Sequence, residues 1–244
     1  MGLGRGAASR RRMIHPISAA MSAAPENFEA TAARLRACRL CRDAPLYGAP
    51  LPHEPRPVVQ GSATARLLIA SQAPGNRAHR SGIPFSDPSG RRLRAWLGLD
   101  EVAFYDPARV AILPMGACFP GLDAKGGDRP PRRECAPTWR ADLLAGLPQL
   151  DLILVIGQYA QAWHLAPRPG GLTETVARWR TILDASARPR VLPLPHPLLA
   201  QQRLAPHESM VRGGAAAGAA RRGNRGDGGR GGVRIAQKKN VVVM

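Results

Sequence analysis

Four cysteines have the residue type and the spacing to hold a metal centre: Cys38 and Cys41 form a C-x-x-C pair, and Cys118 and Cys135 follow much later. No secretory h-region precedes them, so metal binding or free thiols are favoured over a disulfide framework. Such thiolates ligate zinc or an iron–sulfur cluster. The split arrangement favours iron–sulfur, because a compact zinc knuckle would carry a second C-x-x-C pair. Four unrelated buried cysteines are the weaker alternative, since all four lie in polar or loop surroundings.

A loop after the first apolar run is the second segment that we expect to contribute to a functional site. Residues 67–70 have the pattern of a buried strand, and Pro74-Gly75 must break it. We expect a polar loop with one aromatic side chain, Phe85, before a helix over residues 91–97. Strand, loop and helix in this order place the loop at the carboxyl edge of a sheet, where open α/β folds bind ligands. His196, between two prolines, follows the last predicted strand at its carboxyl end.

Strands and helices alternate along most of the chain. The sequence predicts strands over 67–70, 110–113, 151–156 and 191–194, and helices from residue 25 and over 91–97, 138–147, 158–165 and 173–183. Thr138 is the expected cap of the third of these helices, and residues 119–137 are expected to form a polar loop with Cys135 near its end. The alternation favours an α/β fold, a three-layer α/β/α sandwich around a mostly parallel sheet.

The charge of the chain narrows the class of partner. The 244 residues carry a net charge of +18, of which residues 1–20 contribute +4 and residues 213–244 contribute +6, which leaves +8 between them. A basic domain indicates a polyanionic partner, most commonly nucleic acid. An arginine-rich proteome is the alternative explanation. No apolar run is long enough to predict a membrane span, so no membrane partner is expected.

Five separated motifs occur in an order that resembles the uracil-DNA glycosylase superfamily, over residues 28 to 197. They are C-x-x-C, an apolar strand ending in Q-A-P-G, S-G-I-P-F with a following S-G, two more cysteines, and a strand ending in H-P. The similarity is greatest to the iron–sulfur, family-four-like branch. It implies a four-stranded parallel sheet and a structural 4Fe-4S cluster on Cys38, Cys41, Cys118 and Cys135, with zinc as the alternative.

The resemblance also implies a reaction, hydrolysis of the N-glycosidic bond of uracil in DNA after the base has left the stack. Phe85 matches the family residue that stacks on the base, and His196 matches the donor to the uracil oxygens. Gln72 is the expected residue that orients water. The turn residues Ala73, Pro74 and Gly75 are expected at the base, with backbone amides as further donors. Asn76 in the same loop is a further candidate for contact with the base.

Three departures from the family pattern bear on activity. Gln72 and Ala73 stand where the family usually carries an acidic or amide side chain that positions water. Pro114 replaces the asparagine that commonly reads the uracil edge, and it has neither a side-chain amide nor a backbone N–H. The sequence after Pro197 matches neither the loop that enters the DNA nor the closing helix of the family. A shift of reading frame near Leu198 is one hypothesis for this difference.

We therefore expect a disordered basic extension over residues 1–24, a glycosylase-like domain over 25–200 and a disordered Gly/Arg-rich tail over 201–244. An upstream start codon or a transit peptide would account for the extension, and frame-shifted translation or an RNA-binding segment for the tail. The expected protein is a monomeric, cytoplasmic, nucleoid-associated bacterial-type enzyme acting on DNA that contains uracil or another damaged base. The alternatives are a weakened or inactive DNA-binding relative and a zinc-stapled nucleic-acid-binding module.

Overall fold

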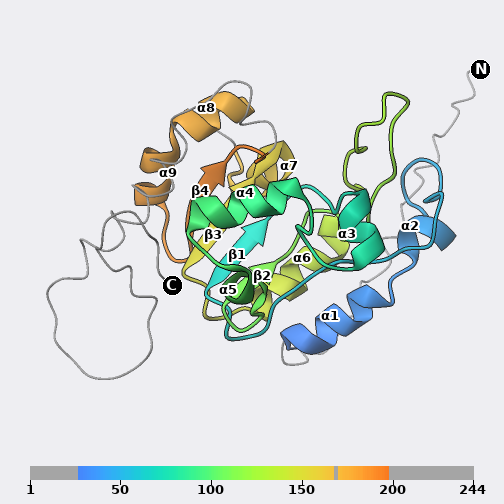
Figure 1. The fold of residues 1–244 in the computed structure, drawn as a ribbon, viewed down its shortest axis with the longest axis horizontal. Coiled ribbons are helices and arrows are strands. Elements are labelled where there is room, and N and C mark those ends of the chain that lie inside the picture. Colours follow the sequence, from blue (N-terminus) through green and yellow to red (C-terminus); the bar gives the residue numbers. More distant parts are fainter. Residues whose placement is uncertain (1–26, 168–169, 198–244) are drawn as a thin grey trace, which may run out of the picture.

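The computed structural model describes residues 27–167 and 170–197, in which a small sheet lies between two layers of helices (Figure 1). The strands are β1 (Leu67–Ala70), β2 (Val110–Ile112), β3 (Leu152–Ile156) and β4 (Arg190–Leu194). Their order in the sheet is β2-β1-β3-β4, and every pair is parallel. The predicted α/β fold is confirmed, and the sheet is entirely parallel rather than mostly so.

The apolar strand runs are continuous because both faces of the sheet are covered. On one face, alternate strand residues such as Leu68 and Ile153 pack with α1 (Phe28–Arg36), α6 (Cys135–Ala145) and α7 (Gly157–His164). On the other face, Ile69 and Leu154 pack with α4 (Pro88–Leu97), α5 (Glu101–Tyr105) and α9 (Trp179–Ala185). Successive side chains point to opposite faces of a strand, so one four-residue run contributes to both cores.

Three local predictions were wrong. The loop after β1 contains a short helix, α3 (Asn76–Ser81), which polar composition concealed. The helix α6 begins at Cys135 rather than at Thr138, and the Thr138 hydroxyl donates to the Glu134 carbonyl oxygen at 2.7 Å inside the first turn. The helix predicted over 173–183 is two helices, α8 (Leu172–Ala177) and α9, with Arg178 between them.

The remaining described helix, α2 (Leu40–Asp43), carries the second cysteine of the C-x-x-C pair. None of the helices in the described ranges is long and apolar enough to cross a membrane. The basic extension over residues 1–24 and the Gly/Arg-rich tail over 201–244 that we predicted lie outside the described residues.

Candidate active site

A small cavity of about 80 Å³ lies at the carboxyl edge of the sheet. Its walls come from segments far apart in the sequence, because parallel strands deliver their carboxyl ends to one edge. The turn after β1 supplies residues 71–75, the loop before α4 supplies Phe85, and the segment after β2 supplies Pro114. The long loop between β2 and α6 supplies Asp128, and the segment after β4 supplies His196.

Hydrogen bonds fix the turn after β1 against its neighbours. The Ser71 and Gln72 carbonyl oxygens accept from the backbone N–H groups of Met115 at 2.8 Å and Gly116 at 3.0 Å. The Gln72 side-chain amide donates to the carbonyl oxygen of Arg129 at 3.3 Å. The turn that carries the Q-A-P-G motif is therefore tied both to the continuation of β2 and to the loop that carries Asp128.

Phe85 is held in a conformation that a phenylalanine rarely adopts. Its φ is 54°, in the left-handed region, and strained backbone of this kind persists only when the surroundings enforce it. The Tyr105 hydroxyl group is placed to donate to the carbonyl oxygens of Pro84, at 3.0 Å, and Phe85, at 3.3 Å. The Phe85 ring packs edge-on against Phe104 with centroids 6.3 Å apart. Behind it, Gly90 of α4 lies so close to the Phe85 backbone that a side chain there would overlap it.

The ionisable groups of the cavity influence one another. Burial lowers the pKa of His196, while the carboxylates of Asp87 and Asp128 act in the opposite direction. Burial also raises the pKa of Asp128, and His196 opposes that shift. Asp87 has a structural task, because its carboxylate caps α4 by accepting from the Gly90 backbone N–H at 3.0 Å and from the Ser89 hydroxyl. The cavity thus contains the imidazole of His196, whose pKa burial lowers, and the carboxylate of Asp128, which does not cap a helix.

The structure brings together most of the predicted site residues. Gln72, Ala73, Pro74, Gly75, Phe85 and His196 all line this cavity. Asn76 does not, since it is the exposed first residue of α3. Asp128 was missed, because the 119–137 segment was interpreted only as the approach to Cys135. The available signal was an isolated acid between Gly126-Gly127 and Arg129, in a loop too long for a simple connection.

The four cysteines also converge, and they line one largely apolar cavity between α1, α2 and the amino end of α6. Burial raises the pKa of the Cys41 and Cys118 thiols to about 12 and that of Cys135 to about 11, and the cysteines influence one another's pKa. The backbone N–H of Ala117 donates to the Cys135 sulfur at 3.3 Å. Among the described residues, no three or more His, Cys, Asp or Glu side chains form a group ready to hold a metal ion.

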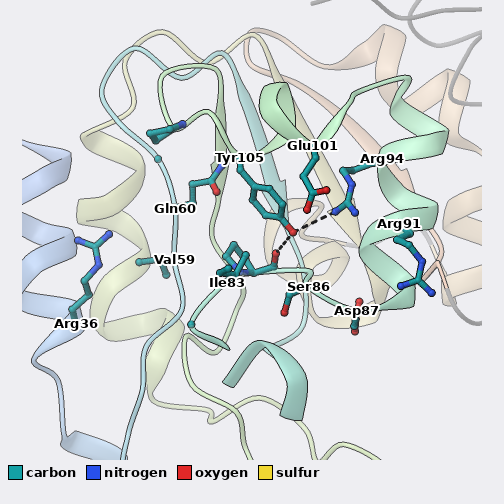
Figure 2. Close-up of a pocket in the computed structure, with 14 residues that line it drawn as sticks. Arg36, Val59, Gln60, Ile83, Ser86, Asp87, Arg91, Arg94, Glu101 and Tyr105 are labelled. Atoms are coloured by element: carbon teal, nitrogen blue, oxygen red, sulfur yellow. Dashed lines mark hydrogen bonds between the residues drawn. The ribbon is translucent and has the colours of Figure 1, made fainter. Parts of the chain in front are cut away.

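A wider groove of about 830 Å³ lies beside the small cavity, and the two share Pro84 and Asp87. Figure 2 shows Arg91 and Arg94 of α4 on one side of this groove, with Arg36 of α1 across from them. The Arg94 guanidinium donates to the Tyr105 hydroxyl oxygen at 3.3 Å. The loop that carries Phe85 therefore separates an enclosed cavity from an open groove with arginines along it.

A comparison with known protein families matches residues 58–209 to the model of the uracil DNA glycosylase superfamily. The match begins just before β1 and includes every segment that lines the small cavity. It covers more than half of the chain, and it supports a glycosylase-like function for the domain. With its parallel sheet and its cavity at the carboxyl edge, the chain belongs to the uracil DNA glycosylase superfamily.

Proposed function

We propose that this protein is a DNA glycosylase that hydrolyses the N-glycosidic bond of uracil, or of a related deaminated base, in DNA. The observation that carries the proposal is that Phe85 and His196, 111 positions apart in the sequence, line the same small cavity. A base can reach such a cavity only after it leaves the helical stack. An aromatic ring and a hydrogen-bond donor are the two groups that a flipped pyrimidine then needs.

The environment of His196 suits a neutral donor. Cleavage of the bond leaves negative charge on the departing base, and a fixed donor aimed at that charge lowers the barrier. Since burial lowers the pKa of His196, the imidazole stays uncharged at neutral pH and can donate one N–H. The amides of the turn after β1 can add further donors at the same edge. The enforced backbone conformation of Phe85 keeps its ring in place before the substrate arrives, which lowers the conformational entropy lost when the ring is ordered on binding.

We also propose that Cys38, Cys41, Cys118 and Cys135 hold a 4Fe-4S cluster, as in the iron–sulfur branch of the superfamily. Zinc ligation, with Zn–S bonds of about 2.3 Å, would require the four sulfurs to close tightly round one ion. The four cysteines line one small cavity, and their split spacing along the sequence favours the cluster over zinc. The cluster would act as a structural staple that ties the amino-terminal helices to the loop before α6. Arg132 of that loop already contacts the segment that follows α2, because its guanidinium donates to the carbonyl oxygens of Tyr47 and Ala49.

A catalytically weakened DNA-binding relative is the second candidate. Two observations favour it: Gln72 is a poor base, and Pro114 lines the cavity where a side-chain amide would read the uracil edge. In either case the partner is DNA, and the basic domain and the arginines of the groove support that choice. The monomeric state and the location at the nucleoid stay predictions.

The two candidates are separated by a uracil-excision assay on single-stranded and mismatched oligonucleotides, with alkaline cleavage of the abasic product. The first candidate predicts cleavage that falls about 100- to 1000-fold in His196→Ala, since one donor to a developing anion contributes that much. His196→Asn keeps an N–H donor and should recover part of the loss. Binding of uracil-containing DNA with no cleavage by the wild-type protein would favour the second candidate.

A further inference from the structure

The predicted site residues include no carboxylate, the group that most effectively assists glycoside hydrolysis. As the bond breaks, the sugar develops oxocarbenium character, and a carboxylate stabilises that charge or takes a proton from the attacking water. The motif after β1 offers only Gln72, whose side chain is uncharged and whose amide already donates to the Arg129 carbonyl oxygen. Gln72 can orient a water molecule but cannot take its proton, so any carboxylate that does so comes from another segment of the cavity wall.

Two carboxylates line the cavity, Asp87 and Asp128. Asp87 is engaged, because its oxygen accepts from the Ser89 hydroxyl and from the Gly90 backbone N–H at the start of α4. The Asp128 carboxylate takes part in none of the hydrogen bonds or ion pairs within the described ranges, and its side chain is exposed enough for water to reach it. Of the two, Asp128 is the carboxylate that is available for chemistry.

The position of Asp128 is fixed by its loop. The backbone N–H of Arg129 donates to the Gly121 carbonyl oxygen at 3.0 Å, and Asp128 forms a bridge with Leu122. On the other side, the Asp128 carboxylate lies over the turn after β1, where a Cβ atom added at Gly75 would be 3.3 Å from Oδ2. The carboxylate thus lies directly against the motif that lacks one. The other ionisable groups of the cavity that interact with it are His196 and Asp87.

We infer that Asp128 is the catalytic carboxylate of this site, supplied by the loop between β2 and α6 in place of an acid in the turn after β1. This inference rests on the proposed glycosylase function. The Asp128 carboxylate accepts a proton from water as the water oxygen bonds to C1′ of the deoxyribose. The C1′–N1 bond breaks, and its electron pair leaves with the uracil anion near His196. The proton then passes from Asp128 through solvent to the released base, which restores the carboxylate.

The test compares the full-length wild-type protein with Asp128→Asn in single-turnover excision of uracil from single-stranded DNA. Asp123→Asn is the matched control, because it removes the same charge from the same loop outside the cavity, where Asp123 accepts from the Gly127 backbone N–H. We expect Asp128→Asn to lower the rate about 100- to 10 000-fold with DNA affinity unchanged within threefold. Asp123→Asn should stay within threefold of the wild-type rate.

A pH profile separates catalysis from a structural role. The wild-type rate should fall at low pH as Asp128 is protonated, and the residual rate of Asp128→Asn should lack that limb, while Asp87 and His196 remain in both proteins. An Asp128→Asn rate equal to that of Asp123→Asn would overturn the inference and leave the glycosylase function intact. A wild-type protein that binds the DNA and releases no uracil would overturn the proposed function, and this inference with it.

Discussion

The close packing of Gly90 against the Phe85 backbone allows a direct test of how rigid the cavity must be for activity. A Cβ atom at position 90 would lie 2.7 Å from the carbonyl carbon and 2.8 Å from the Cβ of Phe85, and closer still to the carbonyl oxygen. Real Cβ atoms essentially never come within 3.0 Å of a heavy atom outside their own residue and its two chain neighbours. Gly90→Ala must therefore displace the Phe85 backbone by a distance on the order of 1 Å, a shift that costs about 100-fold in rate when it misplaces a substrate.

The same change should leave the protein folded. Overpacking costs about 1–3 kcal/mol, and alanine regains up to about 1 kcal/mol over glycine within a helix, so the net loss of unfolding free energy is at most about 3 kcal/mol. The assay is single-turnover uracil release, with DNA affinity and the urea midpoint measured on the same samples. Gly171→Ala is the control, since a Cβ atom there meets nothing within 4 Å and φ is −70°.

A Gly90→Ala protein with a rate within threefold of wild type would refute the reasoning. It would mean either that the loop yields without moving the ring or that the ring does not hold the base. Phe85→Leu separates these two cases, because it removes the flat surface and leaves Gly90 in place. An unchanged rate in Phe85→Leu would exclude stacking by this residue, whereas a large loss would place the error in the assumed rigidity.

The remaining predictions concern stability, the metal centre and DNA. Burial lowers the pKa of His164 to about 3. When the pH falls below about 6.5, the ordinary pKa of histidine, the unfolded chain therefore binds a proton that the folded protein does not. We expect the unfolding free energy from urea titration to be about 2 kcal/mol lower at pH 5 than at pH 7, and a difference that persists in His164→Asn would contradict this. Arg140, 3% exposed, donates to His164 and to the Leu113 carbonyl oxygen, so Arg140→Met should cost about 2–4 kcal/mol in the same titration. Cys135→Ser should abolish bound iron and the absorbance near about 400 nm that a cluster gives, whereas zinc without that absorbance in the wild type would support the zinc alternative. Arg91→Gln should lower the slope of log affinity against log salt by about 1 if DNA follows the groove, and an unchanged slope would exclude phosphate contact by that residue.

Much of the fold followed from short-range pattern. The apolar runs at 67–70, 110–113 and 151–156 predicted strands buried on both faces, which the structure has to within one residue, and their alternation with helices predicted the parallel sheet. In the helix expected over 91–97, Leu93, Trp96 and Leu97 are all buried against the sheet. The boundaries of helices were less predictable. Threonine is a preferred N-cap residue, yet the Thr138 hydroxyl forms its hydrogen bond within the first turn of α6.

For the site, the sequence determined which chemistry is available: thiolates in a C-x-x-C pair and two later positions, an aromatic in a Gly/Pro-flanked loop, and a histidine after the last strand. Residue type and local spacing carry that information. Only the tertiary structure decided which groups meet. It placed Asp128 against Gly75, far along the chain, at the edge of the cavity. That outcome depends on how a long loop folds back over the sheet edge, and a contact between segments some 50 residues apart leaves no periodicity in the sequence from which to predict it.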